Sequence, residues 1–96
     1  SSTYYIRHED ILYVCGGKGK FCDIYTQNGT IRVRLLIEQI RKMLPEQFYR
    51  PHRSYLVNQR HILSYDAGTM TVTLDDESVV YLSRTGKARL KEALAW

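Results

Sequence analysis

Apolar residues alternate with polar ones, or form short runs, along much of the chain, and this pattern predicts short strands. The segments that show it are residues 11–15, 21–26, 31–35, 55–57, 62–65, 69–74 and 79–82. Side chains in a strand point to opposite faces in turn, so a period of two residues marks a strand with one buried face. Asn28-Gly29 and residues 75–78 separate neighbouring segments and are typical of hairpin turns. The pattern predicts a mainly β fold, a small antiparallel domain.

Two other segments repeat their apolar residues every three or four positions, which predicts helices. In residues 36–44 the apolar positions form one face, the remaining positions are polar, and a proline ends the segment. In residues 85–94, Leu90 and Leu94 lie one turn apart among basic residues, so this second helix has a basic outer face. No linker, internal repeat or low-complexity stretch separates these elements. We therefore expect two short helices within a single domain over residues 1–96.

Composition fits a folded chain with an anionic partner. Hydrophobic residues make up 44% and charged residues 25% of the 96 residues, which is ordinary for a globular domain. Fourteen Lys and Arg against ten Asp and Glu give a net charge of +4, which favours a polyanion or an anionic surface as partner. The sequence contains neither an apolar run long enough to span a membrane nor a charged-then-apolar leader, so we expect a cytoplasmic protein without membrane contact.

Catalytic patterns are weak in this chain. Residues 16–20 are rich in glycine, but a phosphate-binding loop needs a Lys-Ser or Lys-Thr pair and a following helix, whereas Phe21 and a strand follow here. His52 with Cys22 or Ser54 would supply a base and a nucleophile. The sequence offers these pairs no identifiable carboxylate partner or oxyanion hole. We therefore expect no enzymatic activity and no cofactor.

The cysteines and histidines do not predict a metal site. Cys15 and Cys22 are spaced unlike the thiols of zinc sites, which lie two to four residues apart. They would pair across a hairpin only under oxidising conditions, and we expect them to be reduced and partly buried. His8, His52 and His61 are scattered along the chain. We expect no bound metal.

Basic side chains gather in three loops. The first loop carries Lys18 and Lys20, the second His52, Arg53 and Ser54, and the third Ser83, Arg84 and Lys87. Pro51 disfavours helix at Arg50, so we expect the second loop to be the entry to a strand. Lysine stems reach phosphates, and a guanidinium can bond a guanine edge. Each loop alone is also consistent with a solvated surface turn, but three in one small β domain favour binding of nucleic acid.

Five segments, in order, resemble the LytTR family of bacterial DNA-binding domains. They are Asp10-Ile11-Leu12-Tyr13-Val14, Thr26-Gln27-Asn28-Gly29, residues 36–44, residues 48–58 with His52-Arg53-Ser54-Tyr55-Leu56-Val57-Asn58, and Leu82-Ser83-Arg84. The resemblance implies an elongated β domain that reads double-stranded DNA with loop side chains in successive major grooves. It also implies the output end of a two-component response regulator, with a receiver domain elsewhere in the full-length protein and two protomers on direct repeats.

The same resemblance assigns expected roles to individual residues. The turn with Lys18 and Lys20 matches the first DNA-contacting position of the family, Arg53 matches the second and Arg84 the third. The residues expected to support them or to contact phosphates are His52, Ser54, Asn58, Ser83 and Lys87. For Asn58, a role in satisfying backbone groups at a strand end is as consistent with the sequence as a DNA contact. The first turn lacks the acidic residue, Asn and Tyr common in the family, so either lysine is a candidate for base contact.

Two alternative functions remain open from the sequence. Tyr13, Phe21, Tyr25 and Tyr49 lie near basic loops, as in small barrels that stack single-stranded DNA or RNA on aromatic side chains. Such a protein would prefer single strands and lose affinity when these aromatics are replaced. A protein-interaction or sensory module would bind DNA weakly and without sequence preference.

Overall fold

The structure is a computed structural model that describes residue 3 and residues 5–94, except for the side chains of residues 18, 89 and 91–94. The strands are β1 (Ile11–Lys18), β2 (Phe21–Thr26), β3 (Gly29–Val33), β4 (Phe48–His52), β5 (Tyr55–Asn58), β6 (Ile62–Asp66), β7 (Thr71–Leu74) and β8 (Val79–Tyr81). The helices are α1 (Ile37–Met43) and α2 (Arg84–Leu94), and the short 3₁₀ turns are η1 (His8–Asp10) and η2 (Gln59–His61).

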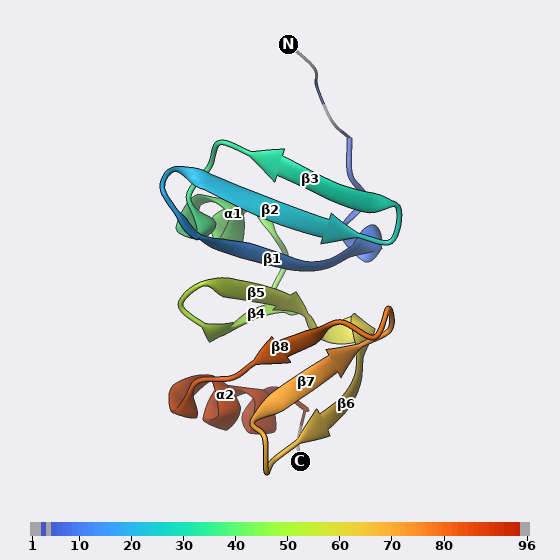
Figure 1. Ribbon diagram of the computed structural model, residues 1–96, viewed down its shortest axis with the longest axis vertical. Coiled ribbons are helices and arrows are strands. Elements are labelled where there is room, and N and C mark those ends of the chain that lie inside the picture. The colour runs from blue at the N-terminus through green and yellow to red at the C-terminus, as the bar shows by residue number, and fades with distance from the viewer. Residues whose placement is uncertain (1–2, 4, 95–96) are drawn as a thin grey trace.

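The strands form two antiparallel sheets that follow each other along the long axis of the molecule (Figure 1). The first sheet has the order β3-β2-β1-β5-β4 and the second the order β6-β7-β8. Helix α1 packs on β1 and β5, and α2 packs on β4. The molecule measures 43 × 24 × 21 Å. The predicted mainly β, elongated antiparallel fold with two short helices is therefore confirmed.

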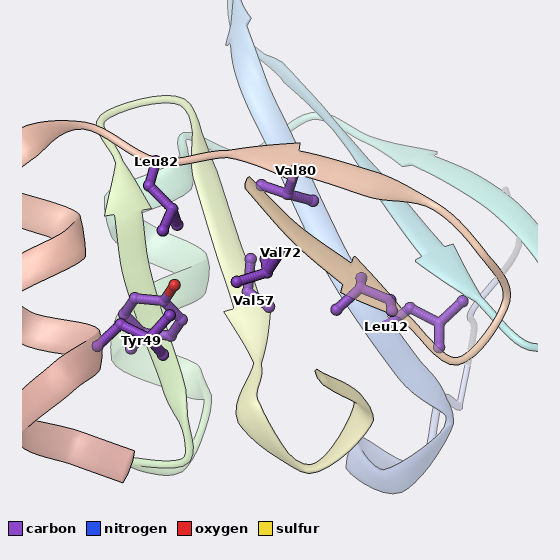
Figure 2. Packing of buried hydrophobic residues seen from close by; sticks show 8 residues of the cluster. Leu12, Tyr49, Val57, Val72, Val80 and Leu82 are labelled. Carbon is purple, nitrogen blue, oxygen red and sulfur yellow. The ribbon is translucent and has the colours of Figure 1, made fainter. Parts of the chain in front are cut away.

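Both faces of the first sheet are covered, which creates two hydrophobic clusters. Neighbouring residues of a strand point to opposite faces, so Leu56 joins the cluster beneath α1 while Val57 joins the cluster shared with the second sheet and α2. Figure 2 shows this second cluster, in which Leu12 and Val57 from the first sheet lie near Val72 and Val80 from the second. The central strands β1 and β5 thus tie the two halves of the molecule together.

Some predicted boundaries were wrong in detail. Strand β3 ends two residues earlier than the alternating pattern suggested, and the turn before it is formed by Gln27 and Asn28, with a positive φ at Gly29. In the first helix, the predicted apolar face is not continuous, since Leu36 and Met43 are exposed beyond it. Amphipathic periodicity identifies a helix, but it does not show how much of the apolar face of the helix is covered by the sheet.

Pro51 lies inside strand β4, where the sequence predicted a loop-like entry. Proline lacks an N–H for the sheet ladder and is tolerated mainly at sheet edges and bulges. Strand β4 is an edge strand, and its pairing with β5 is interrupted by a bulge between Tyr49 and His52. The second basic loop is therefore a tight hairpin turn made of Arg53 and Ser54.

His61 fastens the N-terminal turn to the second sheet. Its Nδ1 lies 2.7 Å from Asp75 Oδ2, and its Nε2 lies 2.5 Å from the carbonyl oxygen of Glu9. Both partners are acceptors, so both ring nitrogens donate when the imidazole is protonated. Burial of the ring lowers the pKa of His61, but the hydrogen bonds to Asp75 and Glu9 and the charges of Asp75 and Asp10 outweigh it and raise the pKa above the ordinary 6.5.

We expect this contact to make stability depend on pH. Because the pKa of His61 is raised in the folded state, its contribution is complete below about pH 6.5 and is lost as the pH rises through the folded-state pKa. Urea unfolding of the wild type and of His61→Gln between about pH 6 and 9 should show a stability difference that shrinks as the pH rises. A constant difference would mean that the pKa of His61 is the same in the folded and unfolded states.

Candidate nucleic-acid interface

The three basic loops lie along one long edge of the molecule. The β1–β2 turn, the β4–β5 turn and the junction between β8 and α2 all lie at the left in Figure 1, one after another along the long axis. We call them the first, second and third tips. The N–H of Gly16 donates to the carbonyl oxygen of Ser54 at 2.8 Å, and this hydrogen bond joins the first two tips. The N–H of Ser83 donates to the carbonyl oxygen of Pro51 at 2.8 Å, and this one joins the second and third tips.

The first tip is a glycine-rich turn that passes close to the second. Gly17 and Gly19 have positive φ values of 102° and 66°, which non-glycine residues rarely adopt. A Cβ at Gly17 would lie 3.1 Å from Ser54 Oγ, so a side chain here would press on the second tip. Lys20 is exposed beside Arg34, a residue that the sequence analysis did not assign to the site. The side chain of Lys18 lies outside the described part of the structure.

The second tip exposes Arg53 at the end of its hairpin. The Nδ1 of His52 accepts a hydrogen bond of 3.2 Å from the N–H of Ser54, and the ring lies 5.7 Å from that of Tyr55. Since Nδ1 acts as an acceptor, the neutral ring carries its proton on Nε2, where it is available as a donor. Arg50, by contrast, is engaged within the protein, with Glu38 and with the carbonyl oxygen of Arg53.

The third tip is the beginning of helix α2. The Oγ of Ser83 accepts from the N–H of Gly86 at 3.0 Å and donates to the carbonyl oxygen of Pro51 at 2.9 Å, so Ser83 caps the helix and attaches it to β4. The residues that follow, Arg84 and Thr85, are exposed, and Lys87 is half-buried. Thr85 was not among the predicted site residues.

Two shallow depressions run between the tips. One of about 300 Å³ separates the second tip from the third and is lined by Arg50, His52, Arg53, Ser83, Thr85 and Gly86. The other, of about 280 Å³, lies between the first and second tips, and Arg50 and Arg53 line both. The positive end of the α2 dipole lies at the depression between the second and third tips, which favours anionic groups there.

Asn58 lies in the protein interior, away from the tips. Its side chain is completely buried, and its Nδ2 donates to the carbonyl oxygens of Ile11 at 3.0 Å and His8 at 3.3 Å. Its Oδ1 accepts from the N–H of Arg60 at 3.1 Å. Of the two roles considered for Asn58, the structure supports the backbone-satisfying one, and a DNA contact by this side chain is excluded by its burial.

The aromatic residues do not form an open stacking surface. Tyr13 stacks on Tyr25 with ring centroids 4.4 Å apart, and burial raises the pKa of Tyr13 to about 12. Tyr49 belongs to the hydrophobic core, and burial raises its pKa further. Phe21 is 45% exposed, near the first tip. Tyr13 and Tyr25 therefore each have one ring face occupied by the other.

The geometry gives no support to thiol or metal chemistry. Cys15 pairs in register with Asp23, so Cys15 and Cys22 face opposite sides of the sheet, and Cys22 is a free, buried thiol. Burial raises the pKa of Cys22, the reverse of what an activated thiolate requires. Among the described residues, no three His, Cys, Asp or Glu side chains gather as metal ligands would. In the same part of the chain no helix has the length and apolar character needed to cross a membrane.

Comparisons with known proteins identify the family and the fold of the chain. The family model described as the LytTr DNA-binding domain matches residues 1–95. A solved LytTr DNA-binding domain from Bacillus cereus, from a protein described as a methyl-accepting/DNA response regulator, has a TM-score of 0.83 and 22% sequence identity, and the match covers 95% of this chain and 86% of that one. At this identity the likeness establishes the fold. No curated protein matches. Since the family model spans nearly the whole chain, the chain belongs to the non-catalytic LytTR family of DNA-binding domains.

Proposed function

We propose that this domain recognises a specific double-stranded DNA sequence by reading two successive major grooves with side chains of its three tips. The observation that carries the proposal is the alignment of the tips along one edge of a molecule 43 Å long. The major groove returns to the same side of B-DNA about every 34–36 Å, so an edge of this length is suited to contacts in neighbouring grooves. The net charge of +4 supports an interface with phosphates.

Within this proposal, base reading belongs to one basic residue in each tip. These are Lys20 or Lys18 in the first tip, Arg53 in the second and Arg84 in the third. An exposed guanidinium can bond O6 and N7 of guanine together, which a single ammonium cannot do with the same geometry. Supporting contacts to phosphates come from His52, Ser54 and Lys87. Ser83 contributes mainly by orienting α2 through its bonds to Pro51 and Gly86.

We further propose the setting in which the domain works. The family supports a bacterial transcription regulator of the two-component type, acting in the cytoplasm, in which a receiver domain of the full-length protein controls the pairing of two protomers on direct repeats. Residues 1–96 then act as one domain, an arrangement supported by β1 and β5, which contribute to both hydrophobic clusters.

Paired substitutions at Arg53 and Lys87 test this function. Arg53→Ala should cost about 1–3 kcal/mol on the preferred duplex and much less on a random one, because the lost bonds exist only with the correct base. Lys87→Ala should weaken both duplexes equally and reduce the slope of log affinity against log salt by roughly one unit. The preferred duplex is obtained by selection from random sequences at ~150 mM salt, and affinities are measured by fluorescence anisotropy.

Circular dichroism of both variants is the control for folding. Selection that recovers no motif would argue against specific readout. Tighter binding to single strands than to duplex, lost on replacing Tyr13 or Phe21, would favour the stacking alternative. If Arg53→Ala weakens both duplexes by one factor, the second tip contacts the DNA backbone, and base reading must lie at Lys20, Lys18 or Arg84.

A further inference from the structure

The hairpin turn of the second tip lacks the positive φ values that two-residue hairpin turns prefer. Arg53 and Ser54 are the two residues between the paired His52 and Tyr55. Two-residue hairpin turns match the twist of their strands best when one or both of these residues have positive φ. Neither Arg53 nor Ser54 has a positive φ. The position of the turn therefore depends on contacts from outside it.

Three such contacts hold the main chain of the turn. Two are the hydrogen bonds already described, from the N–H of Ser54 to His52 and from the N–H of Gly16 to the carbonyl oxygen of Ser54. The third holds Arg53 itself, whose carbonyl oxygen accepts from Nη2 of Arg50 at 2.6 Å and from Nε at 3.2 Å. Two donors on one acceptor fix the direction of this carbonyl, and with it the starting point of the Arg53 side chain.

Arg50 is itself anchored by helix α1. Its Nη1 donates to Oε2 of Glu38 at 2.7 Å, and the other carboxylate oxygen of Glu38 accepts from Nη2 and Nε of Arg41 at 2.6 and 2.9 Å. The Arg50 side chain is 29% exposed, and its charge is opposed by that of Glu38. An arginine whose donors and charge are engaged in this way has less to offer a phosphate than the exposed Arg53 has.

We propose that Arg50, held by Glu38, is a positioning residue that sets the sequence specificity of the second tip by fixing the main chain at Arg53. The inference rests on the proposed function, since it presumes that Arg53 reads a base. Arginine is suited to this role because its planar guanidinium reaches two acceptors in different directions, whereas a lysine ammonium keeps the charge without the fork. Glu38 transmits the position of α1 to the tip.

Arg50→Lys is the decisive variant. Affinity for the preferred duplex should fall about tenfold and affinity for random duplex should change less than about twofold. The salt slope should stay the same, because lysine keeps the positive charge. In the Arg50→Lys background, a further Arg53→Ala should lower affinity for the preferred duplex only a few-fold, because a displaced Arg53 already contributes little to base recognition. Glu38→Gln, at a half-exposed position, should give a smaller loss in the same direction. Arg60→Lys, an exposed arginine in η2, is the matched control and should leave both affinities unchanged.

Three outcomes would overturn the inference. Equal weakening of both duplexes by Arg50→Lys would identify Arg50 as a contact to the DNA backbone rather than a positioning residue. Additive losses for Arg50→Lys and Arg53→Ala would show that the residues act independently. If Arg50→Lys keeps the wild-type specificity while Arg53→Ala loses it, Arg50 has no positioning role, but the proposed function stands. If Arg53→Ala alone leaves specificity unchanged, the base-reading proposal fails instead. Should Arg50→Lys not fold, Glu38→Gln decides the same points.

Discussion

Replacing Gly86 with alanine should lower the free energy of unfolding by about 3 kcal/mol or more, although alanine ordinarily stabilises a helix relative to glycine by about 1 kcal/mol. A Cβ at this position would lie 1.8 Å from the carbonyl oxygen of Pro51 and 2.4 Å from its carbonyl carbon. Both are backbone atoms that cannot rotate away, so α2 would have to separate from β4. Urea unfolding of purified Gly86→Ala measures the loss.

The matched control for this prediction is Ala88→Gly, at an exposed position of the same helix. This change should cost only about the intrinsic difference of 1 kcal/mol. If Gly86→Ala unfolds at the same urea concentration as the wild type, helix α2 does not pack on Pro51 as closely as described. A folded Gly86→Ala with weakened DNA binding would instead show that the helix can shift without unfolding and carries Arg84 with it.

Asn58→Ala is expected to be nearly as damaging, for a different reason. The substitution leaves the carbonyl oxygen of Ile11, in a buried site, and the N–H of Arg60, in a partly buried one, without their side-chain partner. Leaving buried backbone groups unsatisfied costs about 1–3 kcal/mol each, so we expect a loss of roughly 3 kcal/mol in urea unfolding. DNA affinity of the folded fraction should not change. Asn28→Ala, in an exposed turn, should alter stability by less than about 0.5 kcal/mol.

The opposite pattern would contradict the structural role of Asn58. If Asn58→Ala unfolds like the wild type but binds DNA weakly, its side chain must be accessible to the DNA. Measuring affinity at a temperature where circular dichroism shows the variant folded separates the two effects.

Strand positions were predictable from the sequence because one face of each strand is more buried than the other, fully so in strands such as β7. Val72 and Leu74, which alternate with threonines, are indeed fully buried. Pro51 misled the prediction because its tolerance depends on β4 being an edge strand, and that follows from which distant strands pair. The role of Asn58 was undecided for the same reason, since its partner Ile11 lies 47 residues away.

The basic composition of the tips was visible in the sequence, but their arrangement was not. The tips align because β5 pairs with β1, which brings the second turn beside the first, and because Ser83 bonds to Pro51, 32 residues earlier. Arg50 and Arg53 are both arginines in one short segment, and no local pattern separates the engaged one from the exposed one. The difference arises from Glu38, which α1 brings to one of them.

The central position of β5 also bears on how the chain acquires its structure during synthesis. Strands β1, β2 and β3 leave the ribosome as a meander of local hairpins, but β1 finds its second neighbour only after about 40 further residues have been made. Contacts of such long range slow folding, because a large loop must close before they form. Until β5 arrives, one edge of β1 stays unpaired and both hydrophobic clusters lack residues from the middle of the sheet. The nascent domain is therefore most prone to aggregate shortly before β5 emerges.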